Sequence, residues 1–448
     1  MFIKVLIDKV CYNIKYLKYH KKYGDSTMIQ KFSCHDFRNI ICDELEFEHL
    51  NILIGPNNSG KSNFIRALSF AANMVGSQLT DSTYFLSELR RNGWENALNR
   101  WSHKDRFNFV WQLQIEGGNA LDYNLSVHTG KSREDNYICH ESLNSDHPVP
   151  GCDQPYNYFD CHNVERGRGT FSTAGMENMR NKRLYANVAS DESVLLQMDN
   201  LFFENKEMFS TPFVRDNIRK VLEIMKIYFQ KFYSYSCTAF NVAAIREMQD
   251  IQNDGLRLKR DGSNFSNVFY RATCVDENFR KKYSESLRKL MPDCTGIRIS
   301  EPALTTNKVL VELEFNGKFF PLSEVSDGTV HLLLLLLLLN LPENENISML
   351  AIDEPEMNLH PAWQKVLAHE ILRCQSVNQM FISTHSPDFL DEFTPEFLSG
   401  DVGIFVFDPS SKQRIRKLKP SQLKKDLEEW MLGDLYRIGD PLIGGWPQ

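Results

Sequence analysis

Eight consecutive residues, Gly55 to Ser62, carry the clearest chemistry in the sequence, because they match the phosphate-binding pattern G-x-x-x-x-G-K-[ST] at every required position. The apolar run Leu50 to Ile54 precedes them and predicts a strand, and a helical pattern follows. A strand, a glycine-rich turn and a helix N-terminus together direct backbone N–H groups and the helix dipole at an anion. We therefore expect a nucleoside triphosphate site, with Lys61 on the β- and γ-phosphates and Ser62 on Mg²⁺. The residues expected at the nucleotide are Gly55, Asn57, Asn58, Ser59, Gly60, Lys61, Ser62 and Asn63.

Two acids end a second apolar run, Met349 to Asp353, far downstream of the phosphate loop. Asp353 is suited to orient Mg²⁺ through its water shell, and Glu354 is suited to polarise an attacking water. A third apolar run ends at His385, whose ring can donate a hydrogen bond to a γ-phosphate and so sense it. Taken alone, each pattern also fits a structural role, as a solvated turn or a packed histidine.

A fourth candidate is the segment Val325 to Thr329, directly ahead of a leucine-rich helix. Ser326 and Gly328 would present a hydroxyl and N–H groups to an anion at the helix N-terminus. An ordinary N-cap turn has the same residue types.

The elements that must position these residues are predicted by hydrophobic periodicity. Alternating runs predict strands over 29–37, 107–115, 121–127 and 309–315, of which the second and third form an antiparallel hairpin. The stretch from Gly130 to about Lys182 is rich in turn residues and is expected to be an irregular surface insertion. Helices are expected over 191–200 and 214–232.

Composition sets outer limits on size and partners. A chain of 448 residues with 42% hydrophobic and 24% charged residues indicates two or three globular units. The net charge of −7 gives no global basic field for nucleic acid, so DNA contact would need a local patch. The candidates for such a patch are interleaved with acids, which favours a solvated face; they are Arg246, Arg257, Lys259 and Arg260.

Neither the leucine run nor the N-terminus predicts a membrane anchor. Leu332 to Leu339 are eight consecutive leucines, but His331 and Pro342 bound the apolar run well short of the about 20 residues of a span. We expect a helix buried on all sides. Residues 1–27 are rich in Lys and Tyr and are expected to be a dispensable extension.

Ten cysteines lie scattered along the chain, which favours free thiols in a reducing cytoplasm. Cys139, Cys152 and Cys161, with neighbouring histidines, are of zinc-ligand types but lack a C-x-x-C knuckle. Ordinary loop and core positions are the preferred interpretation.

Together the four motifs resemble those of ATP-binding cassette ATPases of the SMC and RecF type, in the branch related to the OLD family. Gly55 to Ser62 matches Walker A, Ser326 to Thr329 the signature motif, and Asp353-Glu354 Walker B with its catalytic glutamate. Glu356 to Pro361 resembles the D-loop, and His385 matches the switch histidine. The signature departs from the usual Ser-Gly-Gly, and neither Gln112 nor Gln114 is assigned to a Q-loop.

The resemblance implies an α/β fold, a P-loop NTPase of ABC/SMC type with a mixed sheet, an antiparallel subsheet and a mainly helical insertion. It divides the chain into an extension over 1–27, ATPase lobe I over 28–129, an insertion over 130–240 and ATPase lobe II over 241–448. ATP and Mg²⁺ are the implied cofactors. Two copies would sandwich two ATP molecules, each held by Lys61 of one subunit and closed by Ser326 and Gly328 of the other.

The implied function is an ATPase whose ATP-dependent dimerisation controls a separately encoded effector, a nuclease, in prokaryotic anti-phage defence or DNA maintenance. The chain carries no long coiled coil, and the 63 residues after His385 are too few for the nuclease domain of OLD proteins. Two alternatives stay open: a RecF-like DNA-binding repair ATPase, and a nucleotide-gated scaffold with little turnover.

The C-terminal segment predicts an amphipathic helix over Gln422 to Met431. Its aromatic and aliphatic residues would either dock a partner or pack on the same chain's ATPase lobe, and the second is the preferred interpretation.

Overall fold

The computed structural model describes residues 27–75, 89, 96–115, 118–130, 135–149, 154–165, 168–174, 183–205, 218–252, 255–300, 307–342, 347–410 and 414–444. The predicted extension over 1–27 lies outside this part except for Thr27. The chain forms two compact units. Unit 1 comprises residues 1–47, 62–232 and 409–416, and unit 2 comprises residues 48–61, 233–408 and 417–448. The predicted domain limits stay predictions.

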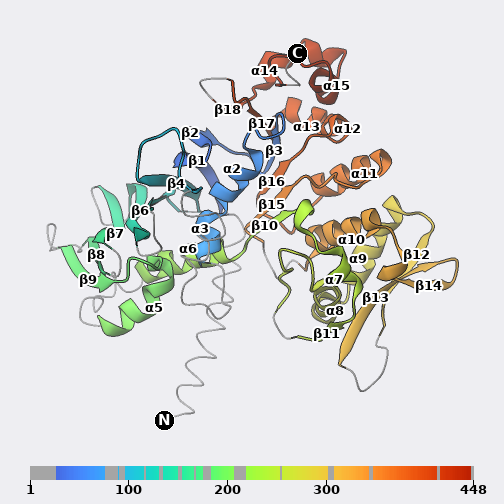
Figure 1. Cartoon of the computed structure of the whole chain (residues 1–448), viewed down its shortest axis with the longest axis horizontal. Helices are drawn as coiled ribbons and strands as arrows, with labels where there is room; N and C mark the ends of the chain where they lie inside the picture. The colour runs from blue at the N-terminus through green and yellow to red at the C-terminus, as the bar shows by residue number, and fades with distance from the viewer. Residues whose placement is uncertain are drawn as a thin grey trace. The chain divides into compact units, whose positions relative to one another are not determined.

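Unit 1 is built on an eight-stranded sheet (Figure 1). In spatial order its strands are β2 (Ile40–Glu46), β1 (Met28–Phe37), β4 (Arg106–Gln114), β5 (Leu121–His128), β6 (Tyr137–Pro148), β7 (Pro155–Glu165), β8 (Arg168–Ala174) and β9 (Arg183–Val188). Each neighbouring pair is antiparallel. The predicted strands and hairpin in β1, β4 and β5 are therefore confirmed.

Helices cover one face of this sheet with an aromatic core. They are α2 (Lys61–Leu68), α3 (Phe70–Val75), α5 (Val194–Glu204) and α6 (Arg219–Gln230). Phe229 of α6 lies 6.0 Å from Trp111 and 5.4 Å from Tyr123 between ring centroids, and all three are buried. Alternation along β4 and β5 buries every second side chain, which is why these runs form strands with one face against helices.

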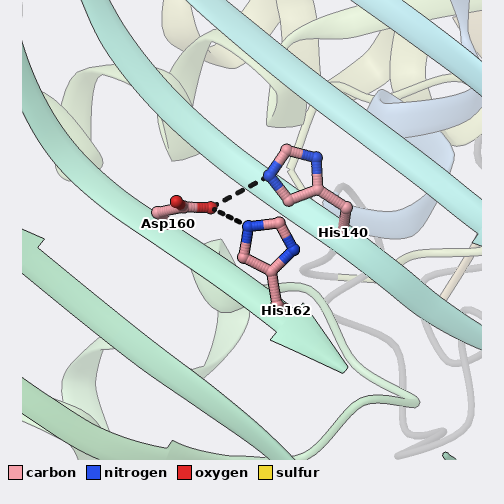
Figure 2. A group of neighbouring side chains, drawn as sticks. All are labelled: His140, Asp160 and His162. Atoms are coloured by element: carbon pink, nitrogen blue, oxygen red, sulfur yellow. Dashed lines mark hydrogen bonds and ion pairs between the residues drawn. The ribbon is translucent and has the colours of Figure 1, made fainter. Parts of the chain in front are cut away.

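The expectation of an irregular segment from Gly130 to Lys182 is wrong, because this stretch contributes β6, β7 and β8. Its turn-forming residues sit in strands whose backbone groups are paired with neighbours on both sides. His140 of β6, for example, lies directly opposite His162 of β7 (Figure 2). Polar residues occupy one face of these strands, and tertiary pairing overrides the weak local propensity. The helices of the predicted insertion are α5 and α6.

Unit 2 contains a six-stranded sheet and a smaller antiparallel sheet. The six strands, in spatial order, are β10 (Phe232–Ser236), β15 (Met349–Asp353), β16 (Met380–Ser383), β3 (Leu50–Ile54), β17 (Val402–Phe407) and β18 (Ile415–Lys417). The smaller sheet contains β11 (Gln249–Asp250), β13 (Lys308–Phe315), β12 (Cys294–Ser300) and β14 (Lys318–Pro321). β15, β16, β3 and β17 are parallel and almost wholly buried, as their continuous apolar sequences require.

The helices of unit 2 are α7 (Val242–Arg246), α8 (Phe265–Val275), α9 (Phe279–Leu290), α10 (Asp327–Asn340), α11 (Pro361–Leu372), α12 (Pro387–Asp391), α13 (Thr394–Ser399), α14 (Pro420–Leu423) and α15 (Leu432–Arg437). Three of them begin at or just after predicted motifs, namely α10 at the signature segment, α11 at the end of the predicted D-loop that follows the acids of β15, and α12 after His385. Short 3₁₀ turns lie at η3 (Cys237–Ala239), η4 (Leu322–Glu324) and η6 (Asp426–Glu428).

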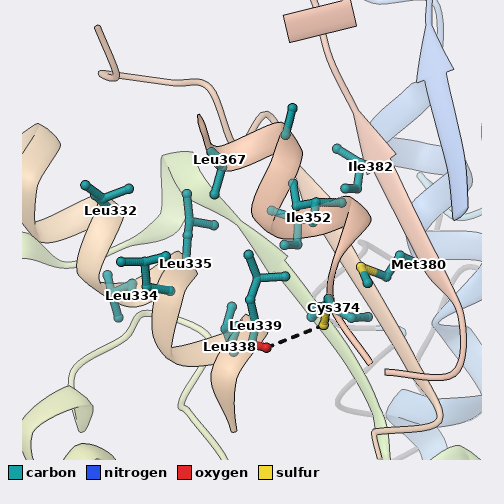
Figure 3. Packing of buried hydrophobic residues seen from close by; sticks show 14 of the residues in the cluster. Leu332, Leu334, Leu335, Leu338, Leu339, Ile352, Leu367, Cys374, Met380 and Ile382 are labelled. Atoms are coloured by element: carbon teal, nitrogen blue, oxygen red, sulfur yellow. Dashed lines mark hydrogen bonds between the residues drawn. The ribbon is translucent and has the colours of Figure 1, made fainter. Parts of the chain in front are cut away.

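The leucine-rich helix is α10, and all eight consecutive leucines are buried. Figure 3 shows Leu335 and Leu339 among side chains from β15, β16 and α11. A helix with apolar residues on every face must be surrounded by protein, as the sequence predicts. Among the described residues no helix is long and apolar enough to cross a membrane.

The single amphipathic helix expected over Gln422 to Met431 is not formed. The segment is split between α14, the turn η6 and an extended stretch before α15. Leu423 and Leu427 are buried in the core of unit 2, whereas Trp430 and Met431 are exposed. The preferred interpretation, packing on the chain's own ATPase lobe, holds for the leucines.

The burial of α10 makes a direct prediction about stability. Leu335→Ala should lower the free energy of unfolding by about 3–5 kcal/mol, because it leaves a cavity in a closely packed core. Leu398→Ala is the matched control, since Leu398 is 39% exposed, and it should cost less than about 1 kcal/mol. Urea denaturation of both variants measures the difference. Equal losses would contradict the described packing of α10.

Candidate functional site

Three predicted motifs meet at one edge of the six-stranded sheet, because the strands that carry them are parallel and in register. Leu53 of β3 pairs with Ser383 of β16, which pairs with Asp353 of β15. The residues after these positions therefore emerge side by side at the carboxyl ends of the strands. In open α/β sheets this edge is where ligands bind.

The phosphate loop leaves β3 through backbone conformations that favour glycine. Gly55 has φ +144° and Gly60 has φ +112°, and Asn58 between them has φ +62°. A Cβ on Gly55 would overlap the carbonyl oxygen of Phe407, so only glycine fits there without a shift of β17. Ser59 is buried, and its hydroxyl has no hydrogen-bond partner among the described residues. The loop thus contains a buried polar group suited to a polar ligand.

Lys61 is held inside this loop by the loop's own backbone. Its Nζ donates to the carbonyl oxygens of Gly55 at 2.9 Å and Pro56 at 3.1 Å, and the side chain is buried. Burial lowers the pKa of Lys61 to about 8, although the carboxylates of Asp353 and Glu354 oppose the shift. Among the described residues this buried ammonium has only neutral acceptors within hydrogen-bond distance, which favours an incoming anion.

The two acids at the end of β15 have different surroundings. Asp353 accepts a hydrogen bond from the Ser383 hydroxyl, which fixes its carboxylate at the sheet edge. Glu354 has φ +57°, a left-handed conformation that is uncommon for a non-glycine residue and is enriched at functional sites. Its backbone N–H donates to the carbonyl oxygen of Ser383 at 3.2 Å. Burial raises the pKa of the Glu354 carboxyl, with a further contribution from Asp353.

His385 lies beside Glu354, with 3.5 Å between its Nε2 and Glu354 Oε1. Burial and the positive charge of Lys61 lower the pKa of His385 to about 4. The ring is therefore neutral at pH 7. Lys61, Asp353, Glu354 and His385 influence one another electrostatically, so the structure brings all four predicted residues into one cluster within unit 2.

Glu356, the first residue of the predicted D-loop, also belongs to this cluster, although no contact with the loop of His385 was predicted for it. It accepts hydrogen bonds from the Thr384 hydroxyl at 2.7 Å and from the backbone N–H of His385 at 2.8 Å. Its second oxygen is buried without a partner among the described residues. Burial raises the pKa of this carboxyl. Glu356 therefore ties the turn after β15 to the loop that carries His385. Its position two residues after the Asp353-Glu354 pair is the sequence feature that could have predicted its place in the cluster.

Tyr436 of α15 also contacts the phosphate loop and was not predicted to do so. Its hydroxyl donates to the carbonyl oxygen of Gly55 at 3.2 Å. Gly433 of the same helix packs against Pro387, and its N–H donates to Asp391 at 2.7 Å. The C-terminal segment thus holds both the phosphate loop and the helix that follows His385.

The predicted signature segment forms a capped helix start. The Ser326 hydroxyl accepts from the backbone N–H of Thr329 at 3.2 Å, and Ser326 itself is exposed. A Cβ on Gly328 would lie 2.5 Å from the carbonyl oxygen of Asn358, so glycine permits the close approach of the predicted D-loop. Ser326 therefore caps the N-terminus of α10, as in the alternative interpretation of an ordinary N-cap turn.

Arg246 holds the signature segment in place. It donates to the carbonyl oxygens of Leu322 at 3.1 Å and Val325 at 2.6 Å, and it pairs with Asp327 at 2.9 Å. The expectation of a solvated face is therefore wrong for Arg246, because three acceptors surround its guanidinium. The guanidinium carbon of Arg257 lies 4.9 Å from the centroid of the Tyr233 ring, so this side chain makes a cation–π contact within the protein.

The remaining predicted nucleotide residues have mixed surroundings. Asn57 and Asn58 are exposed at the tip of the loop. Ser62 and Asn63 belong to unit 1, where Asn63 Oδ1 accepts from Arg38 at 3.2 Å and its amide nitrogen donates to Asn39 at 2.8 Å. The roles of all these residues stay predictions.

Comparison with known proteins identifies the family. The chain belongs to the family described as "AAA domain, putative AbiEii toxin, Type IV TA system", whose model matches residues 50–160 and 234–391, more than half of the chain. The predicted α/β fold of a P-loop NTPase is thereby confirmed. Members of P-loop ATPase families generally bind ATP with Mg²⁺. No curated protein matches the sequence significantly.

Solved structures of low sequence identity resemble the chain along most of its length. An Smc head bound to the C-winged helix domain of ScpA has a TM-score of 0.48 and 14% identity, covering 89% of this chain and 99% of that chain. The Pyrococcus furiosus Smc head with an extended coiled coil, bound to the C-terminal domain of ScpA, has a TM-score of 0.46 and 12% identity. The match covers 90% of this chain and 99% of that chain. The Thermotoga maritima SMC head has a TM-score of 0.41 and 10% identity, and the match covers 88% of this chain and 98% of that chain.

The close approach of Gly55 to Phe407 predicts that replacing this glycine destabilises the protein. Gly55→Ala should lower the free energy of unfolding by about 1 kcal/mol or more beyond Gly317→Ala, because its Cβ must displace β17. Gly317 is the matched control, since it has φ +74° and open space around its Cα. Both variants carry the strain of an alanine at positive φ, and only Gly55→Ala adds the overlap with Phe407. Equal denaturation midpoints for the two would refute the close approach.

Proposed function

We propose that this member of the AAA-domain family is an ATP-binding and ATP-hydrolysing switch that closes as a homodimer around two nucleotides. The single observation that carries the proposal is the cluster of Lys61, Asp353, Glu354 and His385 at the carboxyl edge of the parallel strands. This combination of a buried cation, two acids and a neutral imidazole matches what transfer of a phosphoryl group to water requires.

Binding exchanges internal contacts of Lys61 for contacts with phosphate. In the described structure its ammonium donates to Gly55 and Pro56, which are neutral acceptors. A triphosphate offers charged acceptors to the same donors, and such hydrogen bonds are stronger. The unpartnered Ser59 hydroxyl and the N–H groups of the loop would complete the cradle.

Mg²⁺ bound with the nucleotide would neutralise phosphate charge, and Ser62 and Asp353 are the residues we propose to hold it. The hydrogen bond from Ser383 supports this role of Asp353, because it orients the carboxylate before any ligand binds.

Glu354 is the proposed general base. Its raised pKa brings the carboxyl closer to the pH at which a base accepts a proton from water. Neutral His385 can donate one ring N–H to the γ-phosphate, and Glu356 positions it through the backbone. Glu354 and His385 are thus proposed as the catalytic pair, with Glu356 as a positioning residue.

A homodimer is proposed because the signature residues are available to a second copy. Ser326 and Asp327 are exposed, while Arg246 donates to the carbonyl oxygen of Val325 and pairs with Asp327. A rigid, exposed helix N-terminus with a hydroxyl is suited to a phosphate held by another subunit. Closure would then require the γ-phosphate, and hydrolysis would release it.

We further propose that the switch controls a separately encoded effector acting on nucleic acid, as the resemblance to the OLD-related branch implies. The family description names a toxin of a toxin–antitoxin system, which is compatible with an effector role in defence. A nuclease gene beside this one would support the effector. Salt-sensitive DNA binding by the purified protein alone would favour the RecF-like alternative instead.

Glu354→Gln should abolish ATP turnover and trap the closed dimer, because the amide keeps the shape of the base but cannot accept a proton. We expect at least about a 100-fold loss of phosphate release, together with a dimer in ATP by analytical ultracentrifugation. Lys61→Ala is the paired variant and should stay monomeric in ATP. Wild-type turnover in Glu354→Gln would overturn the catalytic assignment. ATP affinity without Glu354-dependent turnover in the wild type would favour the scaffold alternative.

The lowered pKa of Lys61 predicts how nucleotide affinity depends on pH. Below about pH 8 Lys61 is charged before binding. Above it, Lys61 must take up a proton to face the phosphates, so affinity should fall by up to about tenfold per pH unit. Titration calorimetry between pH 7 and 9.5 measures the slope. Lys61→Arg should flatten it, because a guanidinium stays charged throughout. A slope that is the same in both proteins would contradict this role for Lys61.

A further inference from the structure

A cluster of metal-ligand side chains lies in unit 1, on strands that the nucleotide site does not use. His140 of β6 and His162 of β7 are directly opposite each other in antiparallel register. Asp160 precedes His162 by two residues, so the period of a strand puts both on the same face. Three side chains of ligand type therefore project from adjacent positions of one sheet face.

The three side chains converge on one point. His140 Nε2 lies 2.9 Å from Asp160 Oδ1, and His162 Nε2 lies 3.1 Å from the same oxygen. Figure 2 shows both rings directed at the carboxylate. The rings are stacked, with 4.3 Å between centroids and 14° between planes. One ligand atom from each residue lies within 4.8 Å of the other two.

These separations match the edges of a metal coordination shell. Ligands about 2.0–2.1 Å from a zinc-like ion stand about 2.9–3.4 Å apart at octahedral or tetrahedral angles. The two measured nitrogen-to-oxygen distances fall in this range. The small shifts needed to admit an ion lie within the freedom of side chains on a sheet surface.

The position of the cluster also favours an exchangeable ion. The side chains of Asp160 and His140 are 18% and 31% exposed, and that of His162 is 69% exposed. The site is accessible to solvent, and two strands fix the backbone on which it stands. The Ser172 hydroxyl donates to the backbone carbonyl of Asp160 from β8 and so anchors this residue further.

The cysteines suggested by the sequence are not part of this cluster. Cys161 lies between Asp160 and His162 in β7, so its side chain points to the opposite, buried face. Burial raises the pKa of its thiol, which disfavours the thiolate that binds metal. Cys152 lies outside the described residues. The ligand set at this site is therefore two imidazoles and a carboxylate.

We propose that His140, Asp160 and His162 bind one divalent transition-metal ion of the zinc class. Two nitrogen ligands and one oxygen ligand suit such an ion and leave at least one position for water or an outside ligand. The bound ion would link β6 to β7. This site is independent of the proposed nucleotide chemistry.

Zinc binding to the untagged, full-length protein tests the proposal. Equilibrium dialysis against zinc chloride, with zinc measured by mass spectrometry, should give one ion per chain. His140→Ala and His162→Ala should each weaken binding by at least about tenfold, the lower end of what even outer-sphere changes cause. Asp160→Asn should weaken it as well, since it keeps the shape but removes the charge.

His147→Ala is the matched control and should leave zinc binding unchanged. His147 is also on β6 beside an aspartate, with 2.7 Å to Asp146, but it is outside the cluster. Circular dichroism establishes that each variant is folded. The proposal is overturned if the wild type binds no zinc at micromolar concentration, or if His140→Ala and His162→Ala bind it as tightly as His147→Ala does.

Discussion

The register of four buried parallel strands is the constraint on which the candidate site depends. β15, β16, β3 and β17 are apolar on both faces and pair without a shift, so their carboxyl ends form one straight edge. Leu53, Ser383 and Asp353 are aligned across that edge. A slip of one residue would turn every side chain to the other face of the sheet, which the surrounding core forbids. Residues more than 300 positions apart are thereby held together.

The electrostatics of the cluster follow from this burial. Desolvation shifts the pKa of Lys61 and His385 downward and that of Glu354 and Glu356 upward. Above about pH 8, where Lys61 is largely neutral, an arriving polyanion would restore its charge, which links the binding of a ligand to uptake of a proton. The same low-dielectric surroundings strengthen any contact that the ligand makes.

Local patterns predicted much of the fold and of the candidate site. The strands β1, β3, β4, β5 and β13 and the buried helix α10 were predictable, because each has a continuous or alternating apolar sequence. Residues 55–62 and the acids after β15 were predictable because their chemistry is contiguous in sequence. The strands β6 to β8 were missed, since their polar faces resemble a loop until neighbouring strands pair with them.

Contacts between distant segments could not be predicted. Glu356 accepts from His385, Arg246 holds the segment at Asp327, and Tyr436 reaches Gly55. Each contact joins residues separated by 29 to 381 positions, and the helix or strand periodicity of a sequence does not predict such a pair. The group of His140, Asp160 and His162 is similar, because only the register of β6 and β7 brings it together.

The central claim is that each nucleotide site is completed by a second copy, and mixing two inactive variants tests it most directly. Lys61→Ala removes the phosphate-loop half of the site, and Ser326→Arg blocks the exposed signature half. A mixed dimer would retain one intact site, formed by the loop of one subunit and the signature segment of the other. The account predicts that an equal mixture regains ATP turnover that neither variant has alone, at most about one quarter of the wild-type rate, because random pairing makes half of the dimers mixed and each mixed dimer has one working site of two. A mixture as inactive as its components, with mixed dimers present in solution, would contradict it.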